Sequence, residues 1–218
     1  MSSTAAGACD VSIADIAAMA PVIPVLTIER VHDAVPLARA LVKGGLPVLE
    51  VTLRTDAALA AIKAMAEDVP GAVVGAGTVL DGDQLDQARE AGASFVVSPG
   101  CTPALARATA AAGVPFLPGV QTVSEAMALA EQGFRLLKFF PADSSGGIGW
   151  LRAIAAPLAG CRFCPTGGVS AESAPAYLAL ANVACVGGSW VAPRDAVASK
   201  DWSRIERLAA AAAGLKRR

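Results

Sequence analysis

Arg135-Leu-Leu-Lys-Phe-Phe-Pro-Ala142 is a short apolar run that carries one charged residue, Lys138, at its centre. Two leucines precede the lysine, two phenylalanines follow it, and Pro141 ends the run. A continuous apolar run of this length is typical of a buried β-strand. We therefore predict a strand over residues 136–140 with a lysine side chain in the protein interior.

A buried lysine is chemically informative. Burying an ammonium group among apolar residues is costly, and desolvation favours the neutral amine. A neutral amine is a nucleophile that condenses with a ketone to form a Schiff base. The alternative is a lysine at a strand end that reaches water or pairs with an acid. The run alone supports both interpretations of Lys138 equally.

Similar runs recur on both sides of this stretch, about every 23 residues, with Ala- and Leu-rich helical segments between them. The near-continuous apolar character of the runs is typical of parallel strands covered on both faces. Glycines follow the helical segments. Capping residues precede the helices in Thr55-Asp56, Asp81-Gly-Asp83, Thr102-Pro103, Thr122-Val-Ser-Glu125 and Ser170-Ala-Glu-Ser173. The eight predicted strands are Val22–Ile28, Leu46–Thr52, Ala72–Gly77, Ser94–Ser98, Pro115–Val120, Leu136–Phe140, Arg162–Pro165 and Val183–Gly187.

Eight strand–helix units predict an α/β fold, a compact (β/α)8 TIM barrel, with extra helices over residues 10–19 and 202–213. The alternative is an open doubly wound sheet, which usually has a glycine-rich fingerprint after its first strand. Here the first strand runs into Thr27-Ile-Glu-Arg30, which has no glycine. We expect residues 1–9 to be a disordered N-terminal segment and residues 10–218 to be one barrel domain.

The composition limits the function classes. Of the 218 residues, 54% are hydrophobic and 17% are charged, which is typical of a globular chain. The net charge of −1 argues against a nucleic-acid partner. We see neither an uninterrupted apolar run long enough to span a membrane nor a secretory signal, because Asp10 and Asp15 interrupt the N-terminal region. These features predict a protein that has no membrane partner and is not secreted.

The five cysteines and the single histidine do not suggest a metal site. Cys161 and Cys164 have the spacing of a metal or redox pair, but zinc needs more ligands and no second pair has suitable spacing. We interpret them as structural thiols. His32 lies in a helical pattern beside acidic residues, and we interpret it as a solvated helix residue. We therefore expect no metal and no cofactor.

The active site of such a barrel lies at the C-terminal ends of its strands. Alternation along the second strand places Glu50, Thr52 and Arg54 on one face, which we expect to point into the barrel together with Lys138. A buried ion pair between Glu50 and Lys138 with only a structural role is the alternative. We favour catalysis, because buried pairs contribute little net stability and strand-end charges in barrels usually serve chemistry.

Glycine pairs end the seventh and eighth strands, in Pro165-Thr-Gly-Gly-Val-Ser170 and Val186-Gly-Gly-Ser-Trp190. Glycine lets backbone N–H groups approach an anion, and the loops after these two strands are a recurrent phosphate site in barrels. Tight turns without a ligand are the alternative. At other strand ends, Thr78 is placed to bind a carboxylate and Pro99 to form a wall of the pocket.

The chain resembles the class I 2-keto-3-deoxy-6-phosphogluconate/4-hydroxy-2-oxoglutarate aldolases over nearly its whole length. The first nine residues and the basic tail of residues 216–218 lie outside the resemblance. It rests on Glu50-Val-Thr-Leu-Arg-Thr55, Gly75-Ala-Gly-Thr78, Val97-Ser-Pro-Gly100, Leu137-Lys-Phe-Phe-Pro-Ala142, Pro165-Thr-Gly-Gly168 and Val186-Gly-Gly-Ser189.

The resemblance implies that Lys138 is the Schiff-base lysine and Glu50 the general acid/base. It implies that Arg54 and Thr78 hold the pyruvate carboxylate and that the glycine turns bind the distal phosphate. It also implies a metal-independent enzyme of the Entner–Doudoroff pathway, cytoplasmic and commonly trimeric. The expected substrate-binding residues are Arg54, Thr78, Pro99, Phe140, Thr166, Gly167, Gly168, Gly188 and Ser189.

The expected reaction splits 2-keto-3-deoxy-6-phosphogluconate into pyruvate and glyceraldehyde 3-phosphate, with 4-hydroxy-2-oxoglutarate as a further substrate that yields pyruvate and glyoxylate. A 2-keto-3-deoxy-6-phosphogalactonate aldolase is an alternative, because these enzymes share the pyruvate half of the substrate. Two rivals from other classes are a phosphate-binding barrel isomerase or synthase and a non-catalytic barrel that only binds a sugar phosphate.

Overall fold

The computed structural model describes residues 11–217, which form an α/β fold of alternating strands and helices. The expected disordered segment, residues 1–9, lies outside the described residues. The strands are β1 Val22–Leu26, β2 Val48–Thr52, β3 Val73–Gly77, β4 Phe95–Val97, β5 Phe116–Leu117, β6 Gly119–Val120, β7 Leu136–Phe139, β8 Arg162–Pro165 and β9 Val186–Gly188. The helices are α1 Ile13–Ala18, α2 Val31–Lys43, α3 Ala58–Asp68, α4 Gly82–Glu90, α5 Pro103–Ala112, α6 Val123–Glu131, η1 Asp143–Ser145 (a 3₁₀ turn), α7 Gly147–Ile154, α8 Ala174–Leu178, α9 Arg194–Ala198 and α10 Trp202–Ala213.

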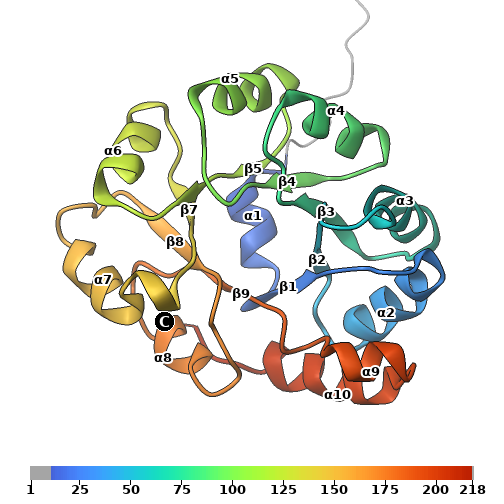
Figure 1. Ribbon diagram of the computed structural model, residues 1–218. Helices are drawn as coiled ribbons and strands as arrows, with labels where there is room; N and C mark the ends of the chain where they lie inside the picture. Colours follow the sequence, from blue (N-terminus) through green and yellow to red (C-terminus); the bar gives the residue numbers. More distant parts are fainter. Residues whose placement is uncertain (1–10, 218) are drawn as a thin grey trace, which may run out of the picture.

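All named strand pairs are parallel. Six strands form one sheet in the order β5-β4-β3-β2-β1-β9, and three form a second in the order β6-β7-β8. Isolated parallel bridges join Phe163 to Val183 and Thr166 to Gly187, beside β8 and β9. Figure 1 shows the strands arranged around a common centre, with the helices that follow them on the outside. This arrangement brings the C-terminal ends of the strands to one side of the molecule.

The predicted fifth strand, residues 115–120, is divided. Its two halves are β5, which pairs with β4, and β6, which pairs with β7, and Pro118 lies between them. Proline has no N–H and cannot donate to a ladder. Its carbonyl still accepts a hydrogen bond from the Lys138 backbone N–H, at 2.8 Å. The proline therefore interrupts the strand where one sheet ends and the other begins, a division that the apolar pattern did not reveal.

The buried apolar residues fall into two clusters. The larger cluster lies between the strands and the surrounding helices. The smaller cluster combines inward-facing strand residues with Ile16 and Ala17 of α1, which lies at the centre of the ring in Figure 1. Its strand members alternate with those of the outer cluster, as the twofold periodicity of strands requires. They include Ile23, Val48, Phe95, Val97, Leu117, Leu136 and Cys164.

The helix starts agree in part with the predicted caps. Asp81, Thr102 and Thr122 accept hydrogen bonds from the backbone of the following turn, and Thr122 forms a full capping box with Glu125. Thr55 does not cap α3; its hydroxyl donates to the carbonyl of Ile28 instead. Ser170 does not cap α8 either, because it exchanges hydrogen bonds with Ser173 ahead of that helix.

Within residues 11–217, the helices are all too short or too polar to cross a membrane. The expected helix over residues 10–19 corresponds to α1, and the expected helix over residues 202–213 corresponds to α10 with identical bounds.

Gly75 in β3 allows a test of whether the interior of the ring of strands has room for another atom. A Cβ atom at this position would lie 2.4 Å from the ring of Phe95, which is fully buried. We expect Gly75→Ala to lower the free energy of unfolding by about 1–3 kcal/mol, measured by urea denaturation, because the interior is already filled.

Combining Gly75→Ala with Phe95→Leu should cost less than the sum of the two single changes, because the smaller side chain vacates the contested space. Gly149→Ala in α7 is the control. No atom lies within 4 Å of its Cβ position, so this change should stabilise the helix by about 0.5–1 kcal/mol. Equal effects of the two alanine substitutions would contradict the packing argument.

Candidate functional site

Lys138 of β7 and Glu50 of β2 meet inside the ring of strands. The Lys138 Nζ atom donates to Glu50 Oε1 at 3.0 Å, and the residues are 4% and 2% exposed. An isolated buried charge is costly, so each side chain requires the other. The structure thus brings together the two residues that the sequence analysis had identified, although they lie 88 positions apart in the chain.

The Glu50 carboxylate lies directly against β3, where two residues are glycine. A Cβ atom at Gly77 would lie 2.3 Å from Glu50 Oε1 and 2.6 Å from its Cγ. Gly77 is the register partner of Thr52, one pleat beyond Glu50. A larger residue at position 77 would occupy the space of the carboxylate. The glycine therefore has a steric function at this site.

Arg54 and Thr78 come together just beyond the ends of β2 and β3. The Arg54 Nε atom donates to Thr78 Oγ1 at 3.2 Å. Thr78 has a φ of 61°, in the left-handed region that a threonine rarely adopts. Such strain is concentrated at functional sites. Thr52, the third polar residue of the predicted inward face, is fully buried and donates to the Leu26 carbonyl at 2.9 Å.

A cavity of about 520 Å³ opens at the C-terminal ends of the strands. Lys138 and Arg54 line it, and the Lys138 Nζ atom lies 5.3 Å from the centre of the Phe140 ring. A cation over an aromatic face at this distance is stabilised. The expected residues that line this cavity are Arg54, Lys138, Phe140, Thr166, Gly167, Gly168, Gly188 and Ser189.

The two glycine turns form one wall of the cavity. Gly167 and Gly168 have φ values of 93° and 79°, which other residues rarely adopt. Gly187 allows the Thr166 hydroxyl to approach, because a Cβ atom there would lie 2.3 Å from Thr166 Oγ1. The start of the turn after β8 therefore packs closely against β9 at the wall of the cavity.

Three of the expected site residues do not line the cavity. Glu50 lies behind Lys138, and Thr78 reaches the site through Arg54. The backbone of Pro99 packs against Gly119, which is the register partner of Lys138. Conversely, sequence reasoning did not select Thr27, Trp190 or Arg194, which line the cavity. Thr27 directly follows β1, and Trp190 lies two residues after β9, so position near a strand end could have identified these two. Arg194 begins α9, six residues after β9, and no local signal marks it.

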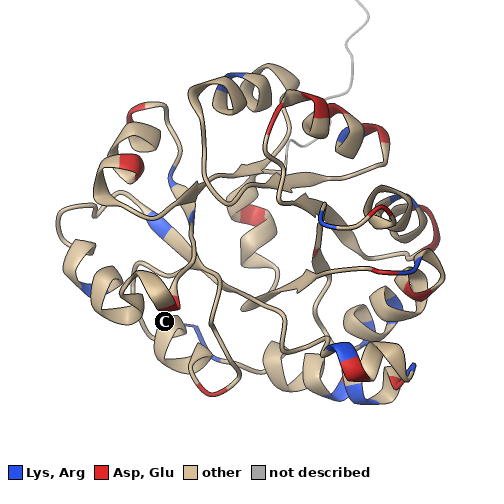
Figure 2. Cartoon of the chain, viewed as in Figure 1, with Lys and Arg blue, Asp and Glu red and all other residues tan. Residues whose placement is uncertain are grey.

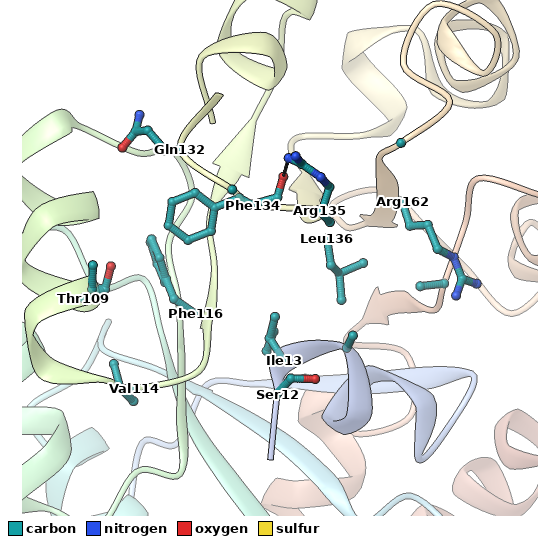
Figure 3. A pocket seen from close by; sticks show the side chains of 15 residues that line it. Ser12, Ile13, Thr109, Val114, Phe116, Gln132, Phe134, Arg135, Leu136 and Arg162 are labelled. Atoms are coloured by element: carbon teal, nitrogen blue, oxygen red, sulfur yellow. Dashed lines mark hydrogen bonds between the residues drawn. The ribbon is translucent and has the colours of Figure 1, made fainter. Parts of the chain in front are cut away.

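A second cavity, of about 530 Å³, lies at the opposite ends of the strands (Figure 3). It lies beside α1 and is lined mainly by apolar side chains such as Ile13, Phe116 and Phe134. Arg135, which also lines it, already donates hydrogen bonds to the backbone carbonyls of Ala130 and Phe134, close to it in the chain. None of the candidate residues lines this cavity. The two cavities therefore have similar volumes but different chemistry, because only the first is lined by the candidate residues.

Among the described residues, no cluster of three or more His, Cys, Asp or Glu side chains has the geometry of a metal site. Cys161 and Cys164 are buried free thiols. The Cys164 Sγ atom lies 3.8 Å from the Thr166 hydroxyl, and the Cys185 thiol is a further neighbour. The hydrogen bond from Cys164, together with burial, raises the pKa of the Cys185 thiol well above its usual range. His32 is exposed and lies 3.4 Å from Asp33.

Comparison with known proteins gives consistent similarities. Residues 13–208 match the family model of KDPG and KHG aldolases, where KDPG is 2-keto-3-deoxy-6-phosphogluconate and KHG is 4-hydroxy-2-oxoglutarate. The KHG/KDPG aldolase of Escherichia coli K12 is 51% identical over 189 residues, which cover 87% of this chain and 89% of the relative.

Two solved structures share the fold. The KDPG aldolase of Zymomonas mobilis ZM4, solved with 3-phosphoglycerate, is 50% identical and has a TM-score of 0.90, with 94% of this chain and 96% of the other covered. The KDPG aldolase of Legionella pneumophila, solved with pyruvate captured as a covalent carbinolamine, is 43% identical and has a TM-score of 0.91. That match covers 93% of this chain and 98% of the other.

The steric function of Gly77 gives a testable prediction. We expect Gly77→Ala to displace the Glu50 carboxylate, to break its 3.0 Å contact with Lys138 and to lower the free energy of unfolding by about 1–3 kcal/mol. A crystal structure and urea denaturation measure the two effects. Gly100→Ala is the control, because no atom lies within 4 Å of its Cβ position. An unchanged ion pair between Lys138 and Glu50 in Gly77→Ala would show that the carboxylate does not need the space left by the glycine.

Proposed function

The chain belongs to the KDPG and KHG aldolase family, and we propose that it splits 2-keto-3-deoxy-6-phosphogluconate into pyruvate and glyceraldehyde 3-phosphate through a Schiff base on Lys138. It also splits 4-hydroxy-2-oxoglutarate into pyruvate and glyoxylate. The observation that carries the proposal is the buried contact between Lys138 Nζ and Glu50 Oε1 beside the cavity. The enzyme is a class I aldolase, a carbon–carbon lyase that needs neither a metal nor a cofactor.

Lys138 forms the covalent intermediate. Transfer of its proton to Glu50, 3.0 Å away, leaves a neutral amine that attacks the C2 ketone of the substrate. Glu50 returns its proton to the carbinolamine hydroxyl, which leaves as water to give an iminium ion and restores the Glu50 carboxylate. The iminium withdraws electrons from the C3–C4 bond. The carbinolamine of pyruvate in the Legionella pneumophila relative supports this step for the present chain.

Glu50 is the general acid/base. As a carboxylate it accepts the proton of the C4 hydroxyl, directly or through one water, while the C3–C4 bond breaks and the aldehyde leaves. The electrons of that bond remain as an enamine of pyruvate on Lys138. Glu50 then helps to return a proton to C3, and water hydrolyses the iminium to release pyruvate. Burial of Glu50 beside the lysine supports this role.

The two ends of the substrate bind to different walls. Arg54, oriented by its hydrogen bond to Thr78, binds the pyruvate carboxylate, because a guanidinium matches a carboxylate in geometry. The phosphate binds the backbone N–H groups and hydroxyl of the glycine turns, Gly167, Gly168, Gly188 and Ser189, with Thr166 at the edge. Phe140 and Pro99 flank the reacting centre. The 3-phosphoglycerate in the Zymomonas mobilis relative supports binding of a phosphorylated ligand.

We further propose that residues 10–218 form one closed (β/α)8 barrel with α1 as an extra N-terminal helix. The bridges beside β8 and β9, which adjoin both sheets, and the packing of α1 among inward-facing residues support this closure. From the family resemblance we propose a homotrimer that acts in the cytoplasm, in the Entner–Doudoroff pathway.

Borohydride trapping tests the central proposal. Incubation with pyruvate and borohydride should reduce the Schiff base to a stable adduct, and peptide mapping by mass spectrometry should place that adduct on Lys138. Lys63→Arg, at a lysine of α3, is the matched control and should leave the adduct intact. A folded wild-type protein without an adduct would eliminate the aldolase mechanism and favour a phosphate-binding barrel isomerase or synthase.

Replacement of Lys138 by arginine should abolish cleavage of 2-keto-3-deoxy-6-phosphogluconate. Arginine retains the charge that Glu50 requires but cannot form the imine. A coupled assay of pyruvate release, together with the unfolding midpoint, measures activity and folding separately. Appreciable turnover by the folded variant would remove Lys138 from the mechanism.

The change Glu50→Gln should separate imine formation from proton transfer. The amide cannot accept the proton of the C4 hydroxyl, so we expect kcat to fall by about 10²–10⁴-fold. Pyruvate should still be trapped on Lys138 after prolonged incubation with borohydride. Normal turnover of this variant would exclude Glu50 as the acid/base.

A further inference from the structure

Arg194 is a charged residue of the cavity that the proposed function leaves without a role. It is the first residue of α9 and follows the turn after β9 by a few positions. Gly188, Ser189 and Pro193 line the same cavity, so this segment forms a continuous wall that ends at Arg194. Arg194 therefore lines the cavity beside the wall that carries the glycine turns.

The other two charged residues that line the cavity have partners. Lys138 contacts Glu50, and Arg54 contacts Thr78. Within residues 11–217, Arg194 has no side-chain hydrogen bond or ion pair. The neighbouring carboxylate of Asp195 binds Arg204 at 2.6 Å instead. The donors of Arg194 are thus available for an anion in the cavity.

We propose that Arg194 is a specificity-determining residue that binds the phosphoryl end of the substrate and favours phosphorylated 2-keto-3-deoxy acids over unphosphorylated ones. This inference rests on the proposed function. The glycine turns offer N–H groups and one hydroxyl, but none of these carries a full positive charge. A phosphate monoester carries between one and two negative charges at neutral pH. A guanidinium supplies the missing charge and matches the phosphate geometry.

A structural role is the competing explanation. Arg194 also lines a smaller neighbouring cavity of about 260 Å³, together with Glu29 and Asp33. Asp33 is buried, and its Oδ1 atom has no hydrogen-bond partner among the described residues, whereas Oδ2 accepts from Arg30 at 2.8 Å. An arginine held by these carboxylates would stabilise the fold and would not distinguish between substrates.

Steady-state kinetics of Arg194→Gln with two substrates distinguish these roles. We expect KM for 2-keto-3-deoxy-6-phosphogluconate to rise about tenfold, at the low end for a charge-assisted hydrogen bond, with kcat nearly unchanged. KM for 4-hydroxy-2-oxoglutarate, which has no phosphate, should change less than twofold. Arg194→Lys should recover part of the loss because it restores the charge. Arg152→Gln in α7, which does not line the cavity, should resemble the wild type.

Ionic strength gives a second readout. In the wild type, kcat/KM for the phosphorylated substrate should fall as salt is added, and this dependence should be weaker in Arg194→Gln because one cation has been removed. Equal changes of KM for both substrates, no change for either, or a loss confined to the free energy of unfolding would overturn the proposal. The pyruvate adduct on Lys138 is the independent check. If the wild type forms it, such results refute only the role of Arg194; if it does not, the proposed function itself fails.

Discussion

The contact between Lys138 and Glu50 is the constraint on which the site depends. Two opposite charges are buried inside the ring of strands, and removal of either would leave the other without a partner in a medium of low polarity. A hydrophobic pair of similar volume would be as good or better for stability. The fold retains an arrangement that stability alone does not favour, which agrees with a chemical role for both residues.

This contact can form only because other positions are small. Gly77 leaves room for the carboxylate, while Gly75, two residues earlier on the same face of β3, leaves room for the Phe95 ring. The two glycines of β3 thus have different functions. Gly75 allows the Phe95 ring to fill the interior, and Gly77 allows the Glu50 carboxylate to lie next to that apolar packing. Apolar packing below the ion pair excludes water from one side, and the cavity admits the substrate from the other.

In the proposed function, two walls of the cavity recognise the two anionic ends of the substrate in different ways. On the side of β2 and β3, a guanidinium is oriented by a threonine in a strained backbone conformation. On the side of β8 and β9, closely packed glycine turns offer backbone donors, and Arg194 adds a charge that belongs to the following helix. A substrate with a carboxylate at one end and a phosphate at the other would therefore be bound in one direction, with its ketone at Lys138.

The sequence by itself determined the alternation of strands and helices, most strand positions and the identity of the central residues. Apolar runs and glycine stops are local signals, and a lysine and a glutamate in buried strands are conspicuous because burial of charge is costly. The division at Pro118, the neighbours of Cys164 and the roles of Thr55 and Ser170 depended on what lay opposite each residue in space. Only the tertiary structure decided that Glu50 lies behind the lysine and not in the open cavity, that Pro99 packs against Gly119, and that Arg194 lines the same cavity as the glycine turns. Such relations are set by strand register and by the path of loops after the strands, and no periodicity in the sequence records them.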